Sequence, residues 1–356
     1  MQIKDYLKIM AEKNASDLFC RAGGPVRMRI DGKISVASDN VLTVDDLIQA
    51  VESVTTEKQR EAFKRHLDID FALYLEETGQ RFRVSIFLQR NTPSIVVRQI
   101  GLAIKSFEEL GFPKGVFEKL SMENRGLVVL TGSMGSGKST TIATMIEYIN
   151  LHSRKHILTI EEPIEFAFED KESIINQREL GPDVYSYGVA LRALTLQSPD
   201  VIYIGNIRDH ETMTTALTAA ETGVLVLSTL HTINATQTIE RIINFFPPHQ
   251  HEQVAVQLSG LLKGVISLRL IPFKDKPGRI PAYESMVLTP TIARLIRERK
   301  VWEIPHYLEE GGIFSMQIFN QSLTRLVRED KISKEEAMKF SDNRDELDLM
   351  IKGIKK

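Results

Sequence analysis

The segment GSMGSGKS at residues 132–139 decides the fold of this chain. It matches the pattern GxxxxGK[ST], directly follows the apolar run Leu127–Thr131 and precedes a helix-compatible run, Thr140–Asn150. Glycines let backbone N–H groups surround phosphate oxygens, and the start of the following helix adds the positive end of its dipole. The sequence therefore predicts a strand, a phosphate-binding loop and a helix, with an ordinary glycine-rich turn as the alternative. Within the loop, Lys138 would neutralise phosphate charge and Ser139 would be a Mg²⁺ ligand.

Short apolar runs rich in β-branched residues recur after this loop, at Ile157–Ile160, Val201–Ile204 and Val224–Ser228. Helix-length stretches separate them. Continuous apolar runs are typical of strands buried on both faces, so we expect an α/β class with a largely parallel sheet and crossover helices. The tail from about Pro290 is expected to be helical, with a break at Gly311-Gly312.

Polar residues follow these runs at the strand ends, where open α/β sheets bind ligands. Glu161 and Glu162 are candidate catalytic carboxylates, with solvated loop acids as the alternative. Asn206 stands where a carboxylate would take the proton of the attacking water; an amide can hold a water but cannot take its proton. Asp200, at the other end of the same strand, is expected to be a turn residue.

Histidines are the next candidates. His231 follows the run Val224–Leu230 at a strand end beside the phosphate loop, so we expect it to sense the nucleotide. His249 and His251 are expected to be structural.

The first hundred residues are typical of a mixed unit of strands and helices. Asp31-Gly32 between two alternating runs predicts a hairpin, and Thr43 and Thr55/Thr56 predict the starts of two helices. Strands are expected at Phe71–Leu75, Arg81–Leu88 and Ile95–Ile100. Alternation along the second of these places Phe82, Val84, Ile86 and Leu88 on one face and Arg81 and Arg83 on the other, and the third strand carries Arg98.

The composition is that of a folded globular protein. The chain has 356 residues, 42% hydrophobic and 26% charged, enough for two domains with buried cores. Its single cysteine, Cys20, excludes an intrachain disulfide and a four-cysteine zinc site. The net charge of −2 opposes a general affinity for nucleic acid, and the apolar runs are too short to span a membrane. We therefore expect a cytoplasmic protein.

Four stretches in this order, GSMGSGKST, ILTIEEPIEF, DVIYIGNIRD and STLHT, resemble the secretion-superfamily hexameric ATPases, and specifically the type IV pilus retraction ATPases, the PilT/PilU family. The resemblance covers nearly the whole chain, including ASDLF near residue 15, GQRFRVSIF at 79–87 and LTPTIARLIRERK at 288–300. It implies an N-terminal PAS-like α+β domain followed by a RecA-like P-loop NTPase core with a helical C-terminal region. With the change of pattern near residue 100, the expected divisions are 1–100, a linker at 101–118, the core at 119–275 and the helical region at 276–356.

The resemblance also assigns roles to individual residues. The Walker A loop would bind the phosphates of ATP through Gly132, Ser133, Gly135, Ser136, Gly137, Lys138, Ser139 and Thr140. Glu161 to Glu165 would be the Asp box, Gly205 to Asp209 the Walker B end, and Thr229 to Thr232 the His box. Arg81, Arg83 and Arg98 match N-domain positions that reach the phosphates across a domain or subunit junction; a solvated strand face is the alternative reading of these arginines.

Several positions depart from the family pattern. The Walker B end usually reads GEMRD, but in this chain it reads GNIRD, and Glu162 replaces the aspartate of EDPIE. The family's LRxALREDPD and AIRNLIRE each lack an arginine in this chain, and the former also lacks two acids. Losing a general base costs about 10²- to 10⁴-fold in rate unless a neighbour such as Glu161 or Glu162 replaces it. We therefore expect ATP and Mg²⁺ binding with weak or partner-dependent hydrolysis.

The sequence leaves three functions open. The first is a homohexameric motor of type IV pilus retraction and twitching motility, docked at the inner-membrane pilus platform protein, which couples ATP hydrolysis to pilus disassembly. The second is a hydrolysis-deficient accessory subunit that binds ATP and works with an active, paralogous retraction ATPase. The third, an assembly or secretion ATPase or a RecA-like nucleic-acid motor, is opposed by the missing zinc cysteines and by the net charge.

Overall fold

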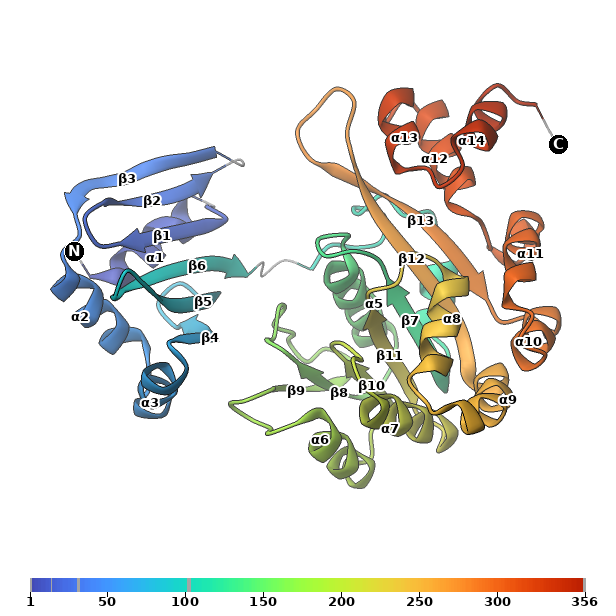
Figure 1. Cartoon of the computed structure of the whole chain (residues 1–356), viewed down its shortest axis with the longest axis horizontal. Coiled ribbons are helices and arrows are strands. Elements are labelled where there is room, and N and C mark those ends of the chain that lie inside the picture. Colours follow the sequence, from blue (N-terminus) through green and yellow to red (C-terminus); the bar gives the residue numbers. More distant parts are fainter. Residues whose placement is uncertain (1, 14, 31–32, 101–103, 355–356) are drawn as a thin grey trace. The chain divides into compact units, whose positions relative to one another are not determined.

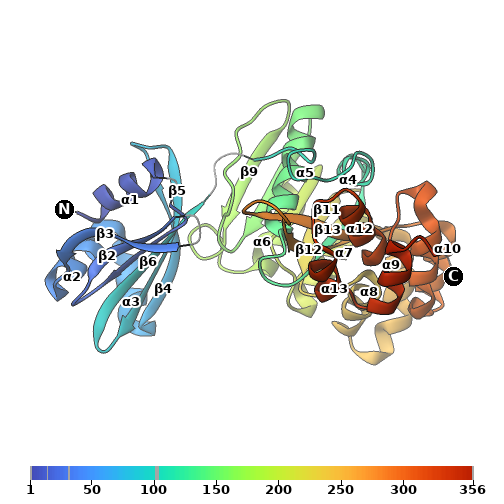
Figure 2. The same ribbon diagram turned by 90° about the horizontal axis from the view of Figure 1, so that it is seen from above.

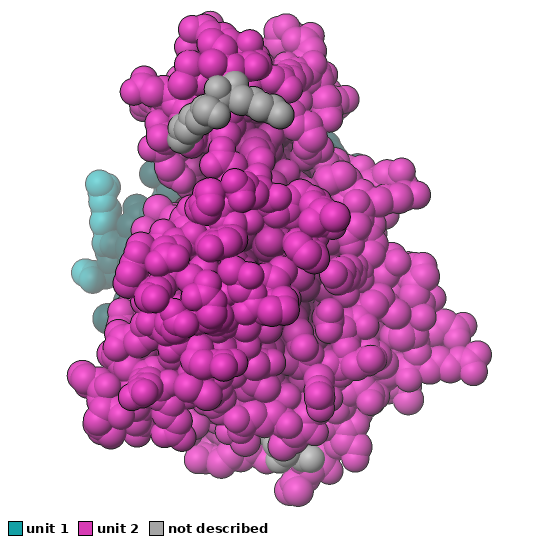
Figure 3. Space-filling view, turned by 90° about the vertical axis from the view of Figure 1, so that its right-hand side faces the viewer, with its two compact units in different colours: residues 1–103, 163–167 teal, residues 104–162, 168–356 magenta. Residues whose placement is uncertain are grey.

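The computed structural model describes residues 2–13, 15–30, 33–100 and 104–354 (Figure 1). The chain divides into two compact units, coloured separately in Figure 3. Unit 1 comprises residues 1–103 and 163–167, and unit 2 comprises residues 104–162 and 168–356. Among the described residues, no helix is both long enough and apolar enough to cross a bilayer.

Unit 1 is an antiparallel six-stranded sheet with helices packed against it (Figure 2). Its strands are β1 (Asp17–Arg21), β2 (Pro25–Ile30), β3 (Lys33–Val41), β4 (Asp68–Leu75), β5 (Gln80–Gln89) and β6 (Thr92–Ile100), in the order β3-β2-β1-β6-β5-β4. Its helices are α1 (Ile3–Glu12), α2 (Val44–Val54) and α3 (Glu57–His66). Leu7, Leu47, Phe82 and Ile95 lie in one buried core, so the expected α+β character is confirmed.

Local chemistry explains where the unit 1 helices begin. The side chains of Thr43 and Thr56 accept hydrogen bonds from the backbone N–H groups of Asp46 and Gln59, three residues on. Both predicted helix starts are confirmed. The predicted hairpin is seen in the antiparallel pairing of β2 with β3, while its turn residues, Asp31-Gly32, lie outside the described residues.

Unit 2 is built on a seven-stranded sheet (Figure 1). Its strands are β7 (Gly126–Thr131), β8 (His156–Glu161), β9 (Ile174–Glu179), β10 (Val201–Ile204), β11 (Leu225–Leu230), β12 (Leu262–Pro272) and β13 (Arg279–Val287). The order is β13-β12-β7-β11-β10-β8-β9, and every neighbouring pair is parallel except β12 with β13. Every residue of β7, β10 and β11 is buried. The predicted α/β class with a largely parallel sheet is therefore confirmed.

Helices cover this sheet and continue beyond it. They are α4 (Val116–Ser121), α5 (Lys138–His152), α6 (Tyr187–Leu194), α7 (His210–Glu221), α8 (Ala235–Asn244), α9 (His251–Leu261), α10 (Pro290–Arg297), α11 (Ile304–Glu310), α12 (Phe319–Arg328), α13 (Lys334–Phe340) and α14 (Arg344–Ile351). Short 3-10 segments lie at Thr195–Gln197, Pro248–Gln250, Val301–Glu303 and Gly311–Phe314. The last of these is the break that Gly311-Gly312 predicted in the helical tail.

Two expected boundaries are wrong. The helical region does not begin at residue 276, because β13 pairs antiparallel with β12 along its whole length and is buried at nearly every position. Residues 104–118 are not a bare linker: Phe107, Phe112 and Phe117 are buried in the core of unit 2. Phe117 lies 4.1 Å from Phe112 and 5.2 Å from Tyr283 of β13, measured between ring centroids.

This aromatic cluster generates a stability prediction. Replacing the fully buried Phe117 with alanine leaves a large cavity between the 104–118 segment and the sheet. We expect Phe117→Ala to lower the free energy of unfolding of unit 2 by about 3–5 kcal/mol. Phe314→Ala, at a side chain that is 49% exposed, is the matched control and should cost far less. Denaturant unfolding followed by the fluorescence of the single tryptophan, Trp302, measures both; equal losses would contradict the packing of Phe117 between Phe112 and Tyr283.

Candidate functional site

The phosphate loop has the backbone shape that its glycines predict. Gly132, Gly135 and Gly137 all have positive φ, and Gly137 caps the start of α5. A Cβ atom at Gly132 would lie 2.5 Å from the carbonyl oxygen of Leu268 and 2.5 Å from Ser136 Oγ, so only glycine fits there. The loop is therefore a tight turn that ends at a helix N-terminus, the arrangement that binds phosphate.

Two side chains inside the loop fit a bound phosphate. Lys138 is buried, and its Nζ donates to the carbonyl oxygens of Gly132 (2.7 Å) and Ser133 (2.8 Å), which keeps the ammonium group within the loop. The Ser136 hydroxyl is buried and has no hydrogen-bond partner among the described residues. A buried hydroxyl without a partner costs free energy. A phosphate oxygen bound in the loop would accept its hydrogen bond and remove that cost. Ser139 and Thr140 lie in the first turn of α5.

The strand ends carry the other predicted residues to the same edge of the sheet. Ile160 is level with Ile204, Ile204 with Ser228, and Leu230 with Thr131, which precedes the loop. Glu161 and His231 directly follow Ile160 and Leu230, and Asn206 is two residues beyond Ile204. The structure therefore brings together the phosphate loop and the three strand ends that the sequence singled out.

His231 connects the phosphate loop with the end of β10. Asn206 Nδ2 lies 3.3 Å from His231 Nε2, so the amide donates and the ring nitrogen accepts. Partial burial lowers the pKa of His231 below 6.5, as do the charges of Lys138 and Arg208, while a hydrogen bond to the Gly132 backbone raises it. The neutral imidazole thus contacts the loop on one side and Asn206 on the other. Asn206 Oδ1 is buried without a partner among the described residues.

The two glutamates differ in environment. Glu161 is buried, and its Oε1 accepts from Thr159 Oγ1 at 2.8 Å and from Gln177 Nε2 at 3.1 Å. Glu162 is more exposed and forms an ion pair with Arg208 at 3.2 Å. Glu161 is therefore held in one orientation, whereas Glu162 lies on the solvent side of the cluster.

Sequence reasoning missed several residues of this cluster. Tyr187 lies beside Gly205, where a Cβ atom would be 3.4 Å from its hydroxyl, and burial followed by the charge of Glu162 raises its pKa. Its hydroxyl is buried and has no hydrogen-bond partner within the described residues. The sequence assigned no role to Tyr187 or to Gln177, although Gln177 lies in INQRELG at 175–181, a stretch that shares the family resemblance. Strand pairing and the helix that follows β9 bring these two residues to the site. Arg208 was visible beforehand as part of GNIRD.

The arginines of unit 1 form a group on its sheet. Arg83 and Arg98 are directly opposite each other on β5 and β6. Arg83 pairs with Asp70, and Arg98 Nε lies 3.0 Å from Asp17 Oδ1. Three of the four apolar residues expected on the other face of β5 are buried, but Leu88 near the strand end is exposed. The Arg83–Asp70 pair is exposed on both sides, and such surface pairs contribute about 0–1 kcal/mol, whereas the carboxylate of Asp17 is buried.

The residues expected to be structural are placed accordingly. Asp200 Oδ2 accepts from the backbone N–H of His156 at 2.8 Å at the start of two neighbouring strands. His251 Nε2 lies 2.9 Å from the carbonyl oxygen of Phe246. Asp200 precedes β10 and is therefore at the opposite end of that strand from Asn206.

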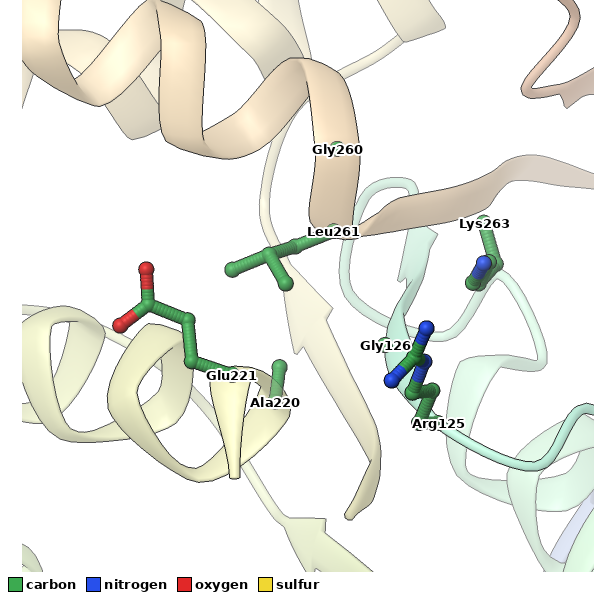
Figure 4. Close-up of a pocket in the computed structure, with 7 residues that line it drawn as sticks. All are labelled: Arg125, Gly126, Ala220, Glu221, Gly260, Leu261 and Lys263. Atoms are coloured by element: carbon green, nitrogen blue, oxygen red, sulfur yellow. The ribbon is translucent and has the colours of Figure 1, made fainter. Parts of the chain in front are cut away.

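A cavity of about 270 Å³ lies at the opposite edge of the sheet from the loop, where β7 and β12 begin. Figure 4 shows Arg125 and Lys263 on one side of it and Glu221 on the other. Because the phosphate loop follows the carboxyl end of β7, this cavity is separate from the nucleotide site.

The environment of His231 generates a second prediction. In the full chain, its imidazole should titrate below 6.5, so that it is neutral at pH 7. Lys138→Met removes a nearby positive charge and should raise the pKa of His231. Lys155→Met is the control and should leave the pKa of His231 unchanged, because Lys155 lies near Asp200 at the opposite ends of the strands. NMR titration of labelled histidines tests this. A native His231 that titrates above 6.5 would contradict its partial burial beside Lys138 and Arg208.

Comparison with known proteins places the whole chain in one group. Residues 2–352 match the family described as "Type II/IV secretion system protein". The chain is 41% identical to the type IV pilus ATPase PilU of Pseudomonas aeruginosa, over 99% of this chain and 92% of that protein. It is also 41% identical to the retraction ATPase PilT of that species, over 95% of this chain and 97% of that protein.

Solved structures agree. The crystal structure of the pilus retraction motor PilT with bound ADP has a TM-score of 0.91 at 42% identity, covering 98% of this chain and 99% of that one. The ATPase DotB of Legionella pneumophila, at 23% identity and a TM-score of 0.83 over 99% of this chain and 96% of that one, shares the fold. Because the family match and these relatives extend over nearly the full length, the chain belongs to the type II/IV secretion system protein family.

Proposed function

We propose that this chain is an ATP-driven motor of type IV pilus retraction, which couples ATP hydrolysis to pilus disassembly and twitching motility. The observation that carries this proposal is the meeting of the phosphate loop with Glu161, Asn206 and His231 at one edge of the sheet. Relatives over the full length that are named PilT and PilU support the pilus assignment.

The loop would bind the phosphates of ATP. Backbone N–H groups of the glycine-rich turn and the start of α5 face the same space as Lys138 and the buried Ser136 hydroxyl. Ser139, in the first turn of α5, is the candidate Mg²⁺ ligand. When bound, Mg²⁺ neutralises charge that develops on the phosphate oxygens. All the other groups that would contact the phosphates belong to the chain's own residues.

His231 would report whether the terminal phosphate is present. Its ring contacts Gly132 of the loop and Asn206 of the neighbouring strand end, so a shift of either segment changes its hydrogen bonds. The neutral ring can both donate to and accept from the groups around it. Asn206 would hold the attacking water through its buried Oδ1, but the water's proton must go elsewhere. Glu161 and Glu162 are the carboxylates that could take it.

Arg81, Arg83 and Arg98 would stabilise phosphate charge from unit 1, within the chain or from a neighbouring subunit. Carboxylates hold Arg83 and Arg98 side by side on neighbouring strands, and a phosphate would replace these carboxylates as their partner. In a homohexameric ring, this exchange would tie nucleotide binding at one junction to rigid-body movement of the units. The ring would act on the pilus platform protein at the cytoplasmic side of the inner membrane.

One observation favours a second function. Asn206 replaces the acid expected at the Walker B end, while the phosphate loop at residues 132–139 keeps the full GxxxxGK[ST] pattern. A chain that binds ATP firmly but turns it over slowly would act as an accessory subunit, transmitting work within or beside a ring of a paralogous retraction ATPase.

Restoring the missing acid separates these functions. We expect the native chain to bind ATP and hydrolyse it weakly, and Asn206→Glu to raise turnover by about 10²- to 10⁴-fold, because a carboxylate can accept the proton of the water. Lys138→Ala should abolish nucleotide binding. Steady-state phosphate release and ATP binding by calorimetry measure both quantities.

The outcomes lead to different conclusions. Native turnover that matches Asn206→Glu and is lost in Lys138→Ala would establish a motor in its own right, with Glu161→Gln and Glu162→Gln then identifying the substitute base. Binding without turnover, rescued by Asn206→Glu, would establish the accessory function. Failure of the native chain to bind ATP at all would refute both.

A further inference from the structure

A row of buried polar side chains crosses three neighbouring strands beneath the phosphate loop. Thr131 of β7 is level with Ser267 of β12, and Ser267 is level with Glu284 of β13. Thr131 and Ser267 are fully buried, and Glu284 is 7% exposed. Thr131 Oγ1 donates to Ser267 Oγ at 3.0 Å, and the Ser267 hydroxyl lies beside the Glu284 carboxyl group, whose pKa it lowers. The row therefore connects the residue before Gly132 with a buried carboxyl group.

Glu284 in turn holds the start of a helix. Its Oε1 accepts the backbone N–H of Ala235, the first residue of α8, at 2.7 Å. That N–H is one of the donors that a helix cannot satisfy internally, and a carboxyl group near a helix N-terminus is favoured by the dipole. Only three residues separate Ala235 from His231. The carboxyl group therefore fixes the segment that carries His231.

The two ends of this row lie at the phosphate loop and at the segment that carries His231. Hydrogen bonds join Thr131 to Ser267 and Glu284 to Ala235. Ser267 and Glu284 are level with each other on neighbouring strands, and His231 lies beside the Gly132 backbone. A chain that only needed to fill this space would do so at lower cost with an apolar side chain, since burying a carboxyl group is unfavourable unless it is hydrogen-bonded. One end of the row, Thr131, precedes the phosphate loop, and the other end, Ala235, lies close in sequence to His231.

The charged groups near Glu284 come from two elements. Burial raises the pKa of Glu284 to about 7, against the Ala235 N–H, the Arg269 charge and the Ser267 hydrogen bond, which lower it, while Asp342 raises it. Arg269 of β12 pairs with Asp342 at 2.7 Å and donates to the carbonyl oxygen of Phe340. Because Arg269 is engaged by Asp342 and by the carbonyl oxygen of Phe340, its positive charge does less to keep Glu284 ionised.

We propose that Glu284 is a positioning residue for the nucleotide site, which sets the place of His231 relative to the phosphate loop by binding the first N–H of α8 and the hydroxyl of Ser267. The proposal rests on the nucleotide-binding part of the proposed function. Glu284 contacts no phosphate itself; it acts through α8 and through the strand that precedes the loop.

Three variants of the full chain test this. Glu284→Ala removes the acceptor, Glu284→Gln keeps an acceptor oxygen but cannot titrate, and Glu240→Ala, at an exposed residue of the same helix, is the control. The first readout is the pKa of His231, followed by NMR on protein with labelled histidines and assigned among the eight by comparison with His231→Gln. The second is ATP turnover as a function of pH.

The proposal expects a specific pattern. Glu284→Ala should release the start of α8, so that the His231 pKa returns upward toward 6.5 and kcat falls by about tenfold to 100-fold with a smaller change in KM. Glu284→Gln should keep the native His231 pKa and remove the part of the pH profile that changes around pH 7. Glu240→Ala should match the native chain in every readout.

Two results would overturn the proposal. One is an unchanged His231 pKa in a folded Glu284→Ala variant; the other is an equal effect of the alanine and glutamine variants, which would mean that the acceptor oxygen is not needed. If Glu284→Ala does not fold, Ser267→Ala breaks the row at its middle and should raise the His231 pKa in the same direction. Absence of ATP turnover in the native chain would decide against the motor and leave the accessory function, and the His231 titration remains a valid test in that case.

Discussion

The pairing of β7 between β11 and β12 is the constraint on which the rest of unit 2 depends. Every residue of β7 is buried, so its backbone groups must find partners on both neighbouring strands, and its side chains must be apolar on both faces. This arrangement holds the end of β7 at one edge of the sheet, where Gly132 begins the phosphate loop. Parallel neighbours end at the same edge, which is why Glu161, Asn206 and His231 gather there.

Polar groups beneath this edge are arranged in hydrogen-bonded sets, because a buried donor or acceptor without a partner costs about 1–3 kcal/mol. Thr159 and Gln177 both donate to Glu161, and Ser267 stands between Thr131 and Glu284. Such sets tolerate few alternative geometries. The loop segments that carry the chemistry are therefore attached to a frame whose positions are narrowly defined.

Nucleotide binding and hydrolysis draw on different parts of this frame. The shape of the glycine turn, the start of α5 and Lys138 belong to the proposed binding site, and none of them contacts the side chain at position 206 in the hydrogen bonds among the described residues. Activation of water depends on that side chain directly. A motor and an accessory subunit can therefore share the whole architecture and differ in one residue.

The sequence by itself determined the local features of this protein. A few consecutive residues are enough to encode each of these features: the phosphate loop, the helix starts at Thr43 and Thr56, and the buried strands. Because the buried strands could be located, the polar residues that follow them could be located as well. Tertiary structure decided the rest. Contacts between segments far apart in the chain place β13 in the sheet and bury Phe107, Phe112 and Phe117. The row that ends at Glu284 arises in the same way, from the pairing of β7, β12 and β13. No local pattern records such pairing, because hydrogen bonds between strands depend on which segments become neighbours when the core is buried.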